Sequence, residues 1–156
     1  MADSDALTSR RLSGWGRAPV VPGAEVRSED LEAVTVGMPL TRGLGRAYGD
    51  AALPAAGDLR VAGSALADRV LHFDPDTGDL TAEAGLSLDE LYRAFLPRGW
   101  FTPVTPGTRF VTLGGMVANA VQTLLADGAA NFQDAGAAPD AVAQIVVERQ
   151  HLVEAD

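Results

Sequence analysis

The sequence predicts an α+β fold, in which helices and strands come from separate stretches of the chain. Val70–Phe73 and the segment that begins at Leu80 flank the turn sequence PDTGD, and this pattern predicts a β-hairpin. The next segment is SLDELYRAF. It begins with Ser87 and Glu90 in a capping box and continues with apolar residues at helical spacing, so it predicts a helix. Two glycine-rich segments, RGLGRAYGD and PGTRFVTLGG, fit neither pattern and predict loops.

The other elements have weaker patterns. Ser28 is the expected N-cap of a short helix in SEDLEAVTV, and a brief strand is expected in GMPLTRG. Residues 1–14 are small and polar, which predicts a flexible N-terminus. An aromatic strand is expected at WF, and a small-residue helix after the Gly-Gly pair. The last segment is VAQIVVERQHLVEAD, in which the β-branched run Ile145–Val147 favours a strand, whereas its length and lack of breakers favour a helix. We expect a helix there.

Composition excludes several classes of function. The chain has 156 residues and a net charge of −9, so we expect no nucleic-acid partner. It has no cysteine and only two histidines, His72 and His151, so no metal site is expected. All 12 basic residues are arginines, which leaves no lysine for a Schiff base or a P-loop. The sequence shows neither a secretory signal nor an apolar run long enough to span a membrane, so a cytoplasmic location is expected.

The two glycine-rich loops suggest a phosphate-binding site. Consecutive backbone N–H groups in such loops form an anion-binding concavity, and Arg42 and Arg46 add positive charge. Gly114 and Gly115 would allow close approach of the backbone to a flat ring or a pyrophosphate. The first loop is neither a Rossmann fingerprint, since its third glycine comes one residue late, nor a Walker A loop, since it lacks the lysine. A phosphorylated cofactor is the natural ligand, and an ordinary surface turn is the alternative for either loop taken alone.

Three segments carry a resemblance to a known family: LSGWGR at 12–17, RGLGRAYGD at 42–50, and the long stretch from FDPDTGDLTAEAG to FVTLGG at 73–115. They resemble the PCMH-type FAD-binding domain of the vanillyl-alcohol-oxidase superfamily, and within it the decaprenylphosphoryl-β-D-ribose oxidase branch. The resemblance implies an α+β, PCMH-type fold of two small subdomains with FAD between them. It also implies oxidation of an alcohol carbon of a sugar or polyprenyl-phosphate sugar by hydride transfer to FAD.

The resemblance also assigns cofactor-binding residues. The pyrophosphate loop would contain Thr41, Arg42, Gly43, Leu44, Gly45, Arg46, Ala47, Tyr48, Gly49, Asp50 and Ala51. The second subdomain would contribute Gly107, Thr112, Leu113, Gly114 and Gly115. The helix beside the flavin would begin between Asn119 and Gln122. No catalytic residue is assigned. Trp15, Trp100 and Phe101 are interpreted as packing residues, and His72 as a structural one.

The sequence departs from the family pattern after Val121. Gln122 stands where the family has the first histidine of a His-rich run, and the rest of that run is absent. We therefore expect residues 15–121 to be the N-terminal part of the FAD-binding domain and 122–156 a divergent segment, with the substrate domain absent. An intact enzyme would then need a completing partner chain, and the truncated core would favour self-association. The alternatives are a non-catalytic remnant or interaction module that binds no cofactor, and a generic nucleotide-phosphate binder.

Overall fold

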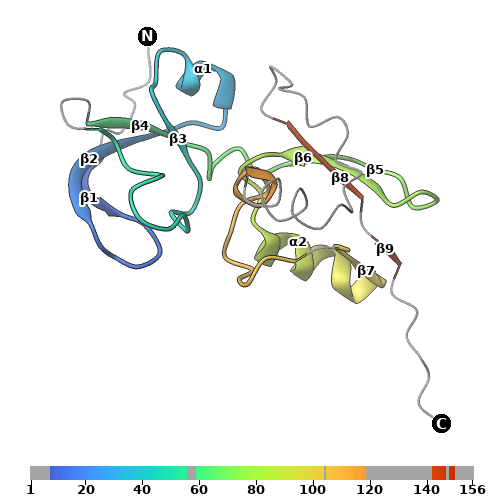
Figure 1. Ribbon diagram of the computed structural model, residues 1–156. Helices are drawn as coiled ribbons and strands as arrows, with labels where there is room; N and C mark the ends of the chain where they lie inside the picture. The colour runs from blue at the N-terminus through green and yellow to red at the C-terminus, as the bar shows by residue number, and fades with distance from the viewer. Residues whose placement is uncertain (1–7, 56–58, 104, 119–141, 147, 150–156) are drawn as a thin grey trace.

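Two lobes, each built on a β-sheet, lie side by side in the computed structural model of this chain (Figure 1). The structure describes residues 8–55, 59–103, 105–118, 142–146 and 148–149. The strands are parallel in part of the first sheet and antiparallel elsewhere, and the helices lie beside the sheets. This mixed architecture confirms the predicted α+β class.

The first lobe is a four-stranded sheet in the order β1-β2-β4-β3. Its strands are β1 (Thr8–Ser13), β2 (Val20–Arg27), β4 (Arg60–Gly63) and β3 (Thr41–Arg42). β1 and β2 are antiparallel, whereas β4 is parallel to both β2 and β3. Helix α1 (Leu31–Thr35) packs Leu31 and Val34 against Val26 of β2 and Ala62 of β4. Because β3 pairs with the buried β4, the chain that leaves β3 starts from a fixed position.

Two details of this lobe differ from the sequence-based expectations. Residues 8–13, predicted to be flexible from their polar composition, form β1, because they make a complete backbone ladder with β2 and because Leu12 is buried against Leu53 and Val61. The N-cap of α1 is Asp30 rather than Ser28: the carboxylate of Asp30 accepts a hydrogen bond from the N–H of Ala33, and the Ser28 hydroxyl accepts one from the N–H of Asp30 just before the helix.

The second lobe is a three-stranded antiparallel sheet in the order β5-β6-β8, with a helix against it (Figure 1). Its strands are β5 (Val70–Phe73), β6 (Asp79–Glu83) and β8 (Val142–Val146). Both halves of the expected hairpin are present, and Gly78 has φ +81 in the turn between them. Helix α2 (Leu88–Phe95) begins with the predicted capping box of Ser87 and Glu90.

After α2, a 3-10 turn, η1 (Leu96–Arg98), ends at Gly99 with φ +83. The expected aromatic strand follows as β7 (Trp100–Phe101), which pairs with β9 (Glu148–Arg149). The core of this lobe consists of buried apolar residues from β6, the link to α2, α2 itself, β7 and the segment after β7: Leu80, Ala82, Leu86, Leu88, Leu91, Trp100, Leu113 and Met116. Trp100 is buried there, as its interpretation as a packing residue requires.

The helix expected in the last segment is wrong over residues 142–146. These residues form β8, which pairs with β6 in antiparallel register from Val142 opposite Glu83 to Val146 opposite Asp79. β-Branched side chains favour an extended chain, and β6 offers a free ladder edge to pair with. Tertiary pairing therefore decided between two local patterns that were nearly balanced.

Near the end of β6, an ion pair holds the β5–β6 hairpin together, and a close backbone approach joins the two lobes. The carboxylate of Glu83, 9% exposed, accepts hydrogen bonds from Nε of Arg69 at 3.0 Å and from the Arg69 N–H at 2.8 Å. Two residues later, a Cβ on Gly85 would overlap the carbonyl oxygen of Ser64. Only glycine allows the chain to cross this closely from β6 toward the first lobe.

The Arg69–Glu83 pair predicts a pH dependence of stability. Hydrogen bonds from Arg69 hold the pKa of Glu83 below its usual value, against the opposing effect of burial. A depressed pKa in the folded state stabilises the protein above the unfolded-state pKa, about 4.3, and this stabilisation is lost as the pH falls. Glu83→Gln should therefore lower the free energy of unfolding at pH 7. Between pH 7 and pH 3, the variant should lose less of its free energy of unfolding than the wild type does. Urea titrations at several pH values would measure both. Glu32→Gln, at an exposed position, should keep the wild-type acid slope; equal slopes for all three proteins would contradict the assignment.

Candidate functional site

The first glycine-rich loop leaves the sheet at the end of β3 and runs from Gly43 to Ala51. Gly45 and Gly49 have φ values of +67 and +60, which side-chain-bearing residues rarely adopt. Within the described part of the chain, no acceptor takes a hydrogen bond from any backbone N–H between Gly43 and Ala51. Backbone donors normally find a partner in protein or solvent. A run of unpaired donors on a fixed, glycine-bent backbone is the arrangement that binds anions.

The side chain of Arg42 packs against this loop and holds its shape. Its Nη1 donates to the carbonyl oxygen of Ala52 at 2.9 Å and its Nη2 to that of Ser13 at 2.8 Å. A Cβ on Gly45 would overlap the guanidinium, so the loop passes directly over it. Burial lowers the pKa of Arg42, and the nearby Glu25 acts in the opposite direction. The side chain remains a cation, and its donors hold both ends of the loop and the preceding turn together.

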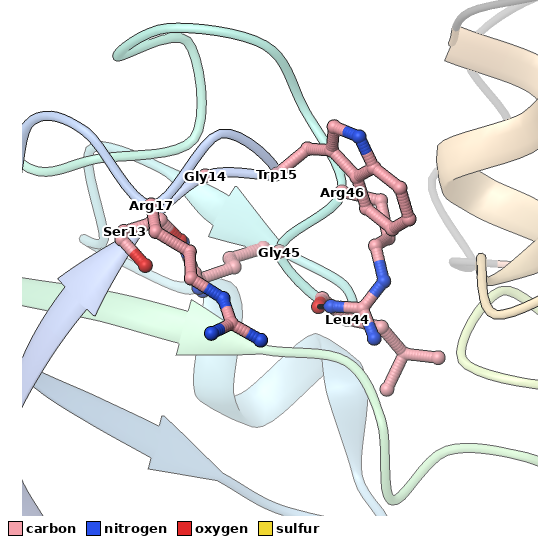
Figure 2. A pocket seen from close by; sticks show the side chains of 8 residues that line it. Ser13, Gly14, Trp15, Arg17, Leu44, Gly45 and Arg46 are labelled. Carbon is pink, nitrogen blue, oxygen red and sulfur yellow. Dashed lines mark hydrogen bonds between the residues drawn. The ribbon is translucent and has the colours of Figure 1, made fainter.

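A hollow of about 490 Å³ opens where this loop meets the turn after β1. The turn contributes Ser13, Gly14, Trp15 and Arg17, and the loop contributes Arg42, Leu44, Gly45 and Arg46 (Figure 2). Three of these residues are arginines and none is acidic, in a chain with 21 acidic and 12 basic residues. The hollow is therefore a local concentration of positive charge in an acidic protein.

Trp15 and Arg46 connect the two walls of the hollow. The N–H of Trp15 donates to the carbonyl oxygen of Ala47 at 2.9 Å, and the Arg46 guanidinium carbon lies 5.5 Å from the centre of the Trp15 ring. That separation is typical of a cation–π contact. Trp15 is 50% exposed, so its interpretation as a packing residue is wrong. The Ser13–Arg17 turn was missed as part of the site, although its SGWGR sequence combines glycine and arginine as the loop does.

The second glycine-rich segment contacts the first. A Cβ on Gly43 would overlap Oγ1 of Thr112, a side chain that is 1% exposed. Thr112 also accepts a hydrogen bond from the N–H of Gly115 at 3.2 Å at the start of helical residues 113–118. The structure therefore brings together two segments that lie about seventy residues apart in the sequence.

Three backbone N–H groups of this second segment already donate hydrogen bonds within the chain. The N–H of Leu113 donates to Leu86, that of Gly114 to Ala84, and that of Gly115 to Thr112. Leu113 is fully buried in the core of the second lobe. A Cβ on Gly114 would lie 3.2 Å from Ala84, so contact within the chain already explains the absence of a side chain there. Segment 112–115 can thus support and shape the first loop, but these three N–H groups are not free for a ligand.

The remaining predicted residues are more peripheral. Tyr48 is 78% exposed, Asp50 and Ala51 are exposed, and Thr41 lies at the edge of its sheet. Gly107 is exposed, with open space where a Cβ would be. Asn119 and Gln122 lie outside the described residues. No group of acidic or histidine side chains suited to a metal ion occurs among the described residues. No helix within the same part of the chain is long and apolar enough to cross a membrane.

The site fits the diphosphate of a dinucleotide cofactor. Unpaired N–H groups line the loop, three guanidinium groups surround the adjoining hollow, and no carboxylate opposes an anion there. A family model described as an FAD binding domain matches residues 33–134, which is more than half of the chain. The chain belongs to this FAD-binding domain family. FAD is therefore its cofactor, and the resemblance inferred from the three sequence segments is confirmed.

Relatives of this FAD-binding domain agree with the assignment. Decaprenylphosphoryl-β-D-ribose oxidase from Mycolicibacterium smegmatis is 38% identical over 120 residues, which cover 70% of this chain and 26% of that protein. The chain thus spans about a quarter of the length of that relative. Among solved structures, cholesterol oxidase from Brevibacterium sterolicum is 12% identical with a TM-score of 0.62, covering 76% of this chain and 25% of that one. Alkyldihydroxyacetonephosphate synthase is 19% identical with a TM-score of 0.52, and the match covers 62% of this chain and 21% of that one. These structures share the PCMH-type fold.

The contact between Gly43 and Thr112 predicts a coupling between the two glycine-rich segments of the FAD-binding domain. Gly43→Ala should force Thr112 away and destabilise the protein by about 1–3 kcal/mol, the usual cost of overpacking. Gly107→Ala is the matched control, since nothing lies near its Cβ position. Denaturant unfolding would measure both variants.

A double variant separates this contact from a general effect of alanine in the loop. Thr112→Ala removes Oγ1 and Cγ2, the two atoms that would lie closest to a Cβ on residue 43. If the contact is correct, Gly43→Ala with Thr112→Ala should be less destabilised than the sum of the single variants, by about 0.5–3 kcal/mol. Additive effects would contradict the coupling.

Proposed function

We propose that this chain is the cofactor-binding part of a flavin-dependent oxidoreductase that oxidises an alcohol carbon of a sugar or of a polyprenyl-phosphate sugar. The observation that carries the proposal is the loop of unpaired N–H groups beside three arginines, in a chain of the FAD-binding domain family. The substrate class is supported by the 38% identity to a decaprenylphosphoryl-β-D-ribose oxidase.

In this proposal, each described segment has a separate task toward the cofactor. The N–H groups of Gly43–Ala51 donate to the diphosphate oxygens, and the neighbouring guanidinium groups balance their charge. Arg42 holds the loop in shape through Ser13 and Ala52, so little order has to be gained on binding. Thr112 and the helical residues behind it set the distance between the loop and the second lobe. When bound, the flavin supplies the acceptor for the hydride that leaves the substrate carbon.

The described residues supply a binding site without an evident acid or base for the alcohol proton. The hollow contains no histidine, carboxylate or lysine. We therefore propose that the substrate-activating groups come from outside the described segments, and that this chain alone binds FAD with little or no turnover.

Flavin absorbance tests the proposal directly. The purified chain is mixed with FAD, excess cofactor is removed, and the visible spectrum is recorded. We expect a retained flavin spectrum. FAD and ADP should both raise the Tm, by an amount equivalent to about 2.7 kcal/mol at a hundredfold excess over Kd, whereas riboflavin, which has no phosphate, should not. A colourless protein with a Tm indifferent to FAD would instead indicate a non-catalytic remnant, and stabilisation by ADP but not FAD a generic nucleotide-phosphate binder.

A pair of glycine variants localises the binding. Gly45→Ala and Gly37→Ala place a Cβ at similar positive φ values, +67 and +70, so their backbone strain is matched. A Cβ at position 45 also meets the Arg42 guanidinium, whereas one at position 37 meets nothing. Gly45→Ala should lose flavin retention and Gly37→Ala should keep it. Equal retention in both variants would place the cofactor elsewhere.

A further inference from the structure

We propose that the Ser13–Arg17 turn is a second wall of the phosphate site, in which Arg17 binds a phosphate or diphosphate anion opposite the glycine-rich loop. The inference rests on the proposed function and extends it to residues that the matched family segment, 33–134, does not include. The anion could come from two sources, the diphosphate of FAD or the phosphate of a phosphorylated substrate. The chemistry of recognition is the same for both.

The first argument is that no carboxylate of the described residues pairs with the positive charge of Arg17. It is exposed, and its side chain makes no hydrogen bond or ion pair with the described residues. By contrast, Arg27, Arg69, Arg93 and Arg109 each pair with a carboxylate. Figure 2 shows the side chains of Arg17 and Arg46 reaching into the space between the turn and the loop, one from each side. No carboxylate lines the hollow, so an anion placed between these two guanidinium groups would be attracted by both.

The second argument is the backbone of Arg17. Its φ is +57, the left-handed region, where it is the one non-glycine residue in the described part of the chain. Such a conformation costs free energy for a residue with a Cβ, and glycine would adopt it more easily. Glycine occupies positions 14 and 16 of the same turn, yet position 17 carries an arginine. An arginine at this position therefore carries a backbone cost that glycine would avoid, and a role for its guanidinium accounts for that cost.

The third argument is that the turn is fixed against the loop. The N–H of Trp15 donates to the carbonyl oxygen of Ala47, and a Cβ on Gly14 would overlap that same oxygen. The N–H of Arg17 closes the turn by donating to Gly14 at 3.1 Å. Arg42 holds the turn from below through Ser13. Arg17 is thus carried on a backbone that is positioned relative to the loop amides before any anion arrives, which is what a binding residue needs.

Binding by a charge-matched pair of variants tests the proposal. Arg17→Gln and Arg11→Gln each remove one positive charge, and Arg11 is an exposed residue outside the lining of the hollow. The probes are inorganic pyrophosphate, ADP, FAD and riboflavin, each followed by calorimetry at two salt concentrations. Arg17→Gln should weaken the affinity for the phosphate-bearing probes by about tenfold or more, as expected for one charge-assisted hydrogen bond, and should reduce their salt dependence. Arg11→Gln should change the affinities for the same probes by less than twofold.

Trp15 provides a local optical readout of the same event. The chain has two tryptophans, and Trp100 is buried in the second lobe. In a Trp100→Phe background, pyrophosphate, which absorbs no visible or near-ultraviolet light, should change the emission of Trp15 by drawing Arg46 away from its ring. The change should need about tenfold more pyrophosphate when Arg17 is replaced by Gln. A merely structural role of Arg17 would alter the Tm without this shift.

The outcomes separate the two sources and the two proposals. If Arg17→Gln weakens the binding of both FAD and ADP, Arg17 contacts the diphosphate of the cofactor. If FAD affinity is unchanged but pyrophosphate no longer binds to the FAD-loaded chain, Arg17 serves a second phosphate. If the wild type binds pyrophosphate through Arg17 but not FAD, the proposed function fails and this inference stands. Equal behaviour of Arg17→Gln and Arg11→Gln toward every phosphate-bearing probe would overturn it.

Discussion

The guanidinium of Arg42 is the contact on which the site depends. Its position at the end of β3 is fixed by the parallel ladder with β4, and from there it reaches two carbonyl oxygens that belong to different segments, Ser13 and Ala52. Hydrogen bonds from a charged donor are stronger than neutral ones, and their strength rises where water is partly excluded. The loop above can then leave its own N–H groups unpaired, because its shape is set by the side chain beneath it.

The two glycine-rich segments show that similar composition can serve opposite purposes. In residues 43–51, glycine bends the backbone and the donors stay available. In residues 112–115, the N–H groups of Leu113, Gly114 and Gly115 donate hydrogen bonds within the chain. The two glycines pack against Val111 and Ala84. The difference comes from burial: Leu113 is anchored in a core, whereas most of residues 46–51 are exposed to solvent. Sequence composition reports where a backbone is bent but does not report which of its polar groups remain free.

The features that could be predicted from the sequence are those whose causes lie within a few residues. The hairpin around Gly78 and the capping box of Ser87 and Glu90 are local, and both are present. β1, β2 and β4 were missed because their ladders join segments far apart in the chain, and β8 was assigned to a helix for the same reason. The loop at 42–50 was singled out as a candidate phosphate site from its glycines and arginines. The Ser13–Arg17 turn was not assigned to the site, because its position beside the loop depends on a hydrogen bond from Trp15 to Ala47 between segments far apart in the sequence.

The position of β8 has a consequence for the newly made chain. β6 is the central strand of its sheet, with β5 on one edge and β8 on the other, and β8 begins at Val142. During synthesis the hairpin of β5 and β6 and the helix after it emerge well before residue 142 leaves the ribosome. For that interval the second edge of β6 presents unpaired backbone groups, the feature that recruits strands from other chains. The nascent protein thus passes through a stage in which its second lobe is open to intermolecular pairing, and the arrival of β8 closes that stage.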